Sequence, residues 1–144
     1  MRNLIACVML LTAGCATTQP TAMVPLNPPH ETSQVEGDGV RVGLVNIAGP
    51  VVTLQVVNLG DEPVVLDRSA IKLVMPLGKE RARLANPEST NVYGIPGLGI
   101  QIVRLRYDFD GVLDSDVVQL DFDHAVTRGN AAVAIPRFAF KPKA

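Results

Sequence analysis

The chain has 144 residues, which suits a single folded domain with a terminal extension, and its formal net charge is −1 at pH 7. This near-neutral balance gives no electrostatic footprint for nucleic acid, and no basic run suggests a membrane-surface patch. Aromatic residues make up 4% of the chain and tryptophan is absent, which argues against a stacking platform for sugars or bases.

The amino terminus has the three parts of an export leader. Arg2 supplies one positive charge, residues 4–11 form an apolar run, and small residues at 12–14 precede Cys15. This order is that of a secretory signal peptide. A transmembrane helix is not expected, because a bilayer span needs about 20 apolar residues.

The pentapeptide at residues 11–15, Leu-Thr-Ala-Gly-Cys, resembles the lipobox of bacterial lipoproteins. The resemblance implies that residues 1–14 are cleaved off and that the Cys15 thiol receives a diacylglycerol, two or more acyl chains being enough for stable anchoring. Because Ala16 rather than aspartate follows the cysteine, it also implies the outer membrane, facing the periplasm. The alternative is an ordinary secreted protein cleaved nearby.

The other cysteine, Cys7, lies inside the predicted leader, so the mature domain is expected to have no thiol and no disulfide. Residues 15–38 are predicted to be a tether, since they are rich in proline and threonine and show little apolar periodicity. The folded domain is predicted to span residues 39–144.

From residue 40 onward, short apolar runs alternate with turns. The runs expected to be strands are 40–44, 51–57, 64–66, 71–75, 81–84, 100–109, 117–123 and 131–140, of which 100–109 is the longest. Residues 85–97 are expected to be a long loop. Seven or eight short strands with turn signals about every 10 residues predict an all-β, antiparallel β-sandwich.

Two of the runs alternate between apolar and polar residues, as a sheet with one buried face requires. The side chains predicted to face inward are Val103, Leu105, Tyr107, Phe109, Val118, Leu120 and Phe122. A short acidic loop joins the two runs, so they are predicted to pair as a hairpin. That pairing would place Arg104 near Asp121 or Gln119 and would make Arg104 and Arg106 supports of the sheet.

Residues 57–64, Val-Asn-Leu-Gly-Asp-Glu-Pro-Val, resemble the strand–turn–strand found early in immunoglobulin-like and fibronectin-like modules of bacterial envelope proteins. The resemblance covers about residues 40–140 and implies an immunoglobulin-like sandwich. The paired cysteines and the tryptophan of antibody domains are absent. Such a fold by itself carries little functional information.

Residues 108–115, Asp-Phe-Asp-Gly-Val-Leu-Asp-Ser, resemble the nucleophile motif of haloacid-dehalogenase-type phosphatases. The resemblance implies Asp108 as nucleophile, Asp110 as general acid and base, and a magnesium ion. That family requires a doubly wound α/β domain with further motifs downstream, whereas the residues after Ser115 predict strands. The phosphatase is therefore a remote alternative.

The same acidic loop offers carboxylate oxygens at short spacing, from Asp108, Asp110, Asp114 and Asp116. Hard cations such as calcium favour oxygen ligands, although the terminal glutamate of an EF-hand is lacking. The alternative interpretation of this acidic segment is a hairpin loop exposed to solvent.

The two histidines, His30 and His124, do not define a transition-metal site or a catalytic triad.

The long loop is the candidate partner contact, because loops on a rigid scaffold often carry recognition. Its candidate residues are Asn91, Tyr93 and Ile95. The sequence as a whole favours a non-enzymatic envelope lipoprotein that binds another envelope protein, with no cofactor and no nucleic acid. The alternative is a lipoprotein that binds a small ligand or calcium through residues 108–116.

Overall fold

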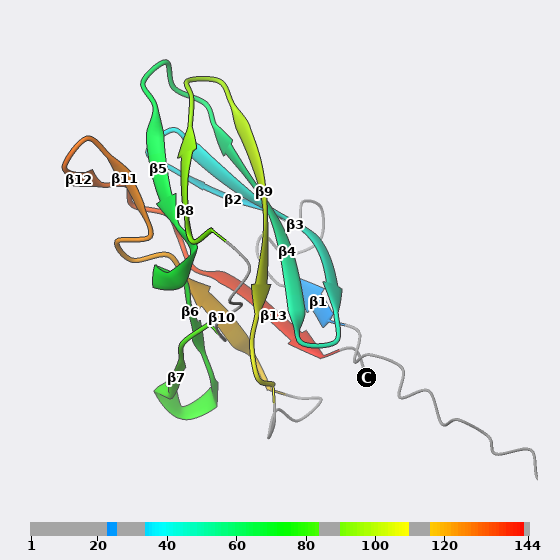
Figure 1. Cartoon of the computed structure of the whole chain (residues 1–144). Coiled ribbons are helices and arrows are strands. Elements are labelled where there is room, and N and C mark those ends of the chain that lie inside the picture. The colour runs from blue at the N-terminus through cyan, green and yellow to red at the C-terminus, as the bar shows by residue number, and fades with distance from the viewer. Residues whose placement is uncertain (1–22, 26–33, 84–89, 110–115, 143–144) are drawn as a thin grey trace, which may run out of the picture.

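The structure, a computed structural model, describes residues 23–25, 34–83, 90–109 and 116–142. Within these ranges, every regular element is a β-strand or a short 3₁₀ helix. The strands form three antiparallel sheets of five, four and four strands (Figure 1). The prediction of an all-β, antiparallel sandwich is confirmed.

One layer is a continuous sheet with the strand order β2-β3-β4-β9. Its members are β2 (Gln34–Gly37), β3 (Val40–Ala48), β4 (Val51–Asn58) and β9 (Ile100–Arg106). Along β4 every second residue is buried, because successive side chains of a strand point to opposite faces. The longest strand is β3, with 9 residues, and not the run 100–109 predicted from the sequence, of which β9 includes 7.

The opposite layer contains the other two sheets, which follow each other end to end. One has the order β12-β11-β5-β8 and the other β1-β13-β10-β6-β7. Their strands are β5 (Val64–Asp67), β8 (Val92–Ile95), β11 (Val126–Arg128), β12 (Ala131–Ala132), β1 (Met23–Pro25), β6 (Lys72–Val74), β7 (Glu80–Arg81), β10 (Val118–Asp121) and β13 (Phe138–Pro142). The 3₁₀ helix η1 (Arg68–Ala70) joins β5, in one sheet, to β6, in the other. β5 pairs with β11 and β6 pairs with β10, and these two partner strands also follow each other in the chain.

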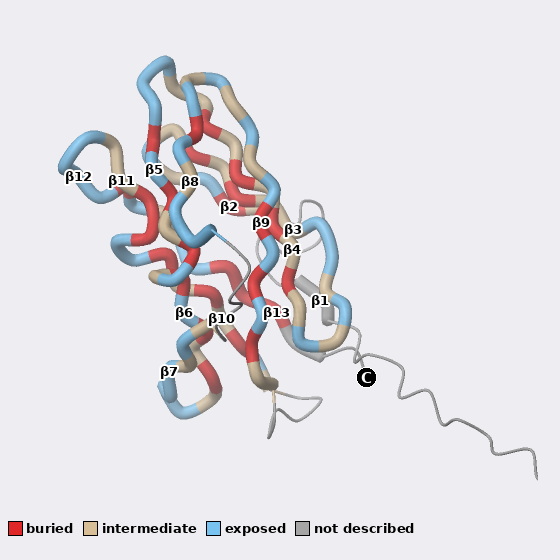
Figure 2. The backbone as a smooth tube through the Cα atoms, viewed as in Figure 1, coloured by how far each residue is buried: buried red, intermediate tan, exposed pale blue. Residues whose placement is uncertain are grey.

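The core lies between the two layers, and buried apolar residues of all three sheets contribute to it. Figure 2 shows buried residues along the strands of both layers. Its largest fully buried side chains include Tyr107, Phe122, Phe138 and Phe140. The Tyr107 hydroxyl donates to the carbonyl oxygen of Ile71 at 2.8 Å, which satisfies the one polar group of this ring. The predicted inward face is confirmed: its members are buried, apart from Phe109, which packs half-buried against the core.

The predicted hairpin between the runs 100–109 and 117–123 is wrong. β9 pairs with β4, where Arg104 faces Thr53, and β10 lies between β13 and β6. Asp121 instead pairs with Arg137, at 2.9 Å. The two strands belong to opposite layers, and both turn their apolar side chains into the shared core. The alternation of apolar and polar residues shows which face of a strand is buried, but it does not identify the strand that pairs with it.

Two strands lie inside the segment 15–38 that the sequence assigns to the tether. β1 pairs with β13, and β2 pairs with β3 in a tight hairpin, so the predicted boundary at residue 39 falls within a turn. Asp38 and Gly39 form this turn with φ values of 46° and 75°. An Asp-Gly pair favours positive φ at both central positions of a hairpin turn, and the assignment of residues 15–38 to a tether did not consider this signal.

Candidate functional site

The acidic loop lies only partly within the described residues. Asp108 and Asp116 are described, whereas Asp110 and Asp114 lie outside the described ranges, as do Cys15 and His30. Asp108 is 3.8 Å from the Arg81 guanidinium. In the described part of the chain, no three histidine, cysteine, aspartate or glutamate side chains come together in a group able to hold a metal ion.

The other sequence candidates within the described residues are Asp108, from the phosphatase-like motif, and His124. The strand that leads to Asp108 is β9. Among the described strands its partner is β4, and the pairing is antiparallel, whereas the phosphatase motif requires a buried parallel strand. His124 is exposed and lies 2.8 Å from its neighbour Asp123. The structure therefore brings neither residue into a catalytic arrangement among the described residues.

Part of the predicted partner loop is a strand. Val92–Ile95 forms β8, which pairs antiparallel with β5. Ile95 is buried in the core and cannot contact a partner, which corrects its assignment. Tyr93 is half-buried, and Asn91 is exposed and accepts a hydrogen bond from Arg83. The sequence did not predict this four-residue strand because glycines and prolines surround it. Its two β-branched residues and its tyrosine are nevertheless typical of β-structure.

The turn between β8 and β9 is fixed by Asn58, which is fully buried at the end of β4. The Asn58 Nδ2 donates to the carbonyl oxygens of Glu62, at 2.7 Å, and Pro96, at 3.2 Å, and Oδ1 accepts from the Gly60 amide at 3.1 Å. The amide of Leu98 donates to the Gly60 carbonyl oxygen at 2.9 Å. Two turns from different parts of the chain are thus joined around one side chain, which brings β8 and β9 side by side.

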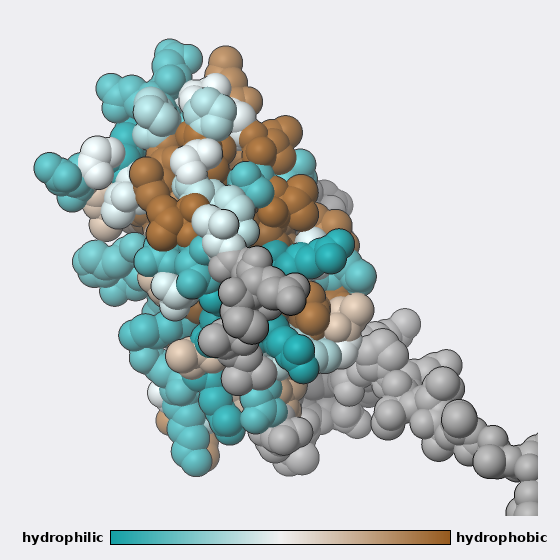
Figure 3. All heavy atoms as spheres, viewed as in Figure 1, coloured by the Kyte–Doolittle hydropathy of each residue, from teal (hydrophilic) through white to brown (hydrophobic). Residues whose placement is uncertain are grey.

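Exposed apolar side chains gather over β5, β8 and β9 (Figure 3). We call this surface the edge patch, and its members are Val65, Val92, Leu98, Ile100 and Ile102. Of the strands that the structure describes, β8 and β9 are each the last in their sheet, so each turns one side of its backbone away from the strands that it pairs with. Neighbouring apolar side chains of this kind on a soluble domain mark an interaction surface more often than single exposed residues do.

Beside the edge patch lies a cleft of about 470 Å³, which we call the arginine cleft. Its lining residues are Val51, Arg68, Arg83, Tyr93, Ile102, Arg104 and Arg106. Arg104 and Arg106 project from the outer face of β9, and Arg68 comes from η1 in the opposite layer. Among the residues that the structure describes, none of those that line this cleft is acidic.

Arg68 is held in place although it is charged and only 5% exposed. Its Nη1 donates to the Arg104 carbonyl oxygen at 2.9 Å, and its guanidinium lies 5.6 Å from the centre of the Tyr93 ring. Burial, together with the charge of Arg68, lowers the pKa of the neighbouring Arg83. The sequence interpretation of Arg104 and Arg106 as supports of the sheet missed this site, because Arg68 and Arg83 meet them only through the fold.

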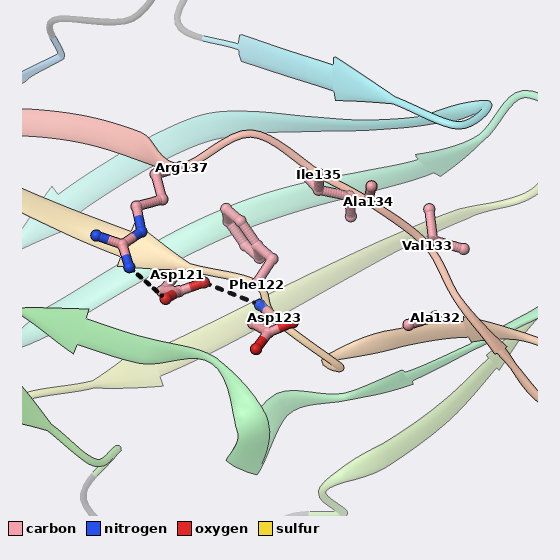
Figure 4. A pocket seen from close by; sticks show the side chains of 8 residues that line it. All are labelled: Asp121, Phe122, Asp123, Ala132, Val133, Ala134, Ile135 and Arg137. Atoms are coloured by element: carbon pink, nitrogen blue, oxygen red, sulfur yellow. Dashed lines mark hydrogen bonds and ion pairs between the residues drawn. The ribbon is translucent and has the colours of Figure 1, made fainter.

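A second hollow, of about 410 Å³, lies between the end of β10 and residues 132–137 (Figure 4). Arg137 and Asp121 form an ion pair there at 2.9 Å, and Asp121 also accepts a hydrogen bond from the Asp123 amide at 3.0 Å. The ion pair and the hydrogen bond satisfy the Asp121 carboxylate within the protein. The local structure therefore accounts for the charged groups of this hollow.

Comparison of the chain with protein-family models, with curated proteins and with solved structures gives no match. None of the helices in the described ranges has the length and apolar character needed to cross a membrane.

Proposed function

We propose that this protein is a lipid-anchored component of the bacterial cell envelope whose immunoglobulin-like sandwich binds another envelope protein through the edge patch. The leader and the lipobox-like residues 11–15 support attachment through Cys15. The alanine after this cysteine supports the outer membrane, on its periplasmic side. An acylated terminus anchors the molecule by itself, which leaves the apolar surface of the domain available for a protein.

The edge patch is the observation that carries the proposal. Ile100 and Ile102 are separated by one residue, so both side chains point outward from β9, and each is about half exposed. Val92, at the start of β8, is likewise about half exposed. The free side of an edge strand can pair with an extended segment of another protein, and the alternate side chains of that segment are then read by the neighbouring surface.

The partner that fits this surface is therefore an extended segment with apolar residues at every second position. Such a segment would hydrogen-bond to the free edge of one strand and place its side chains against the exposed valines and isoleucines. In this mode the main-chain hydrogen bonds supply affinity, and the apolar side-chain contacts supply specificity.

Site-specific photocrosslinking in living cells tests this proposal. A photoreactive residue at position 92 is expected to capture one dominant protein, whereas the same residue at position 77 is expected to capture none. Leu77 is a matched control because it is 97% exposed and lies in the 3₁₀ helix η2 (Pro76–Gly78), outside the edge patch. The variant Ile100→Glu is expected to reduce the crosslinked product at least tenfold, on the order of 1.4 kcal/mol of binding free energy.

The variant Ile100→Glu should keep the fold, since the Ile100 side chain is 58% exposed and exposed substitutions change stability by about 0.5 kcal/mol or less. The same product from positions 92 and 77, or an undiminished product with Ile100→Glu, would contradict the proposal.

A further inference from the structure

The two edge strands of the edge patch, β8 and β9, differ in how far their outward backbone groups are already hydrogen-bonded. In an antiparallel pair, alternate residues direct their N–H and C=O groups toward the partner strand, and the residues between them direct theirs away. The Gly99 carbonyl oxygen accepts from the Asn58 amide at 2.9 Å. The Tyr107 amide donates to the Pro50 carbonyl oxygen at 2.8 Å, and the register between these two contacts is continuous. The even-numbered residues of β9 therefore turn their backbone groups toward its free edge.

Two side chains already occupy this free edge of β9. The Arg68 Nη1 donates to the outward carbonyl oxygen of Arg104 at 2.9 Å, and the burial of Arg68 holds this contact in place. The Gln101 Nε2 donates to the outward carbonyl oxygen of Ile102 at 3.0 Å. A carbonyl oxygen can accept a second hydrogen bond, but the backbone of an added strand would have to lie where these side chains lie. Covering an edge in this way keeps a strand from pairing with another chain.

The free edge of β8 is uncovered by comparison. The Asn91 carbonyl oxygen accepts from the Arg68 amide at 2.8 Å, so Asn91 and every second residue after it bond toward β5. Asp67, the partner of Val92 on β5, directs its amide away from β8 to a carbonyl oxygen at 2.8 Å. Val92 and Gly94 therefore turn their N–H and C=O groups outward. Within the described part of the chain, no side chain or backbone group hydrogen-bonds to them.

The outward face of β8 also has a gap at Gly94, which we call the glycine notch. A Cβ atom added at this position would have nothing within 4 Å. Gly94 pairs across the sheet with Val65, which is 43% exposed on the same face. A side chain from a strand beside β8 could therefore lie over Gly94 and contact Val65.

We infer that β8, and not β9, receives the extended segment of the partner protein, and that this segment places a large apolar side chain in the glycine notch. The inference rests on the proposed function and names the strand that binds. Val92 and Gly94 each supply one N–H donor and one C=O acceptor, which are the groups that strand addition uses. Large side chains, aromatic ones above all, stabilise a sheet when they lie over a glycine of the neighbouring strand.

Photocrosslinking from position 65 in living cells tests this inference. Val65 lies on β5, so benzoylphenylalanine at this position changes neither edge strand. Gly94→Pro removes an outward N–H and breaks no hydrogen bond to β5, and Ile102→Pro does the same on β9 with respect to β4. Each proline variant is compared with alanine at the same position, so that the pair differs chiefly in the N–H group.

Gly94→Pro is expected to give about tenfold less crosslinked product than Gly94→Ala, because the incoming segment loses a main-chain hydrogen bond. Ile102→Pro and Ile102→Ala should agree within about twofold, since the edge of β9 is not used. Gly94→Leu keeps the N–H group but fills the glycine notch, and it is also expected to reduce the product about tenfold. Thermal unfolding of each purified variant checks the fold, and Gly94→Leu decides the question where a proline variant does not fold.

An undiminished product with Gly94→Pro or Gly94→Leu, or an equal loss from proline at positions 94 and 102, would overturn the inference and leave the proposed function standing. The absence of any product from positions 65 and 92 in the otherwise unaltered chain would contradict the proposed function, and this inference with it.

Discussion

Replacing Asn58 by aspartate is expected to destabilise the domain by about 3–5 kcal/mol at pH 7. The Asn58 amide group is fully buried and donates to backbone carbonyl oxygens of Glu62 and Pro96. Aspartate would replace this donor by a carboxylate oxygen that faces the same carbonyl oxygens. Urea unfolding of the wild type and the variant at pH 7 measures the loss.

The matched control is Asn46→Asp, since Asn46 is an exposed residue of β3. Its free energy of unfolding is expected to change by about 0.5 kcal/mol or less. The new carboxyl of Asn58→Asp should have a raised pKa, because it is buried among oxygens. A raised folded-state pKa favours the fold below the unfolded value of about 3.9, so the loss should be smaller at pH 4 than at pH 7. Equal losses in the two variants would contradict the role given to Asn58.

Replacing Gly97 by alanine is expected to cost about 3 kcal/mol and to disturb the turn between β8 and β9. A Cβ atom at this position would lie 2.0 Å from the Asp61 carbonyl oxygen and 2.5 Å from the carbon of the same group. Both atoms are backbone, so the two turns that pack together here would have to move apart. Thermal or urea unfolding measures the loss.

Gly94→Ala is the control for this substitution. Gly94 lies only three residues away in β8, and nothing is within 4 Å of the position that its Cβ would take. Alanine there should leave stability unchanged or raise it by up to about 1 kcal/mol, because glycine costs conformational entropy within a strand. If both variants lose the same free energy, the close approach of the two turns does not explain the glycine at position 97.

The sequence was sufficient to predict which strand faces are buried and insufficient to predict how the strands pair. Val118, Leu120 and Phe122 are buried as their alternation indicates, yet the strand before them in the chain belongs to the opposite layer. In a sandwich, two strands with the same pattern can be neighbours in one sheet or can face each other across the core. Only the register of the hydrogen bonds distinguishes these cases.

The candidate surfaces were not predicted from the sequence. The run Ile100–Val103 is apolar at three of its four positions, on both faces of β9, but that β9 ends its sheet is known only from the structure. The arginine cleft could not be predicted in the same way. Arg68 and Arg104 are 36 positions apart in the chain and meet only because η1 packs against β9.

The claim that lipid holds this sandwich at the envelope is tested most directly by mass spectrometry of the mature amino terminus. The account predicts that the first residue is Cys15 and that its thiol carries a diacylglycerol. It also predicts that a Cys15→Ser variant leaves the membrane fraction. A mature protein that retains residues 1–14, or one that begins at Cys15 with an unmodified sulfur, would contradict it.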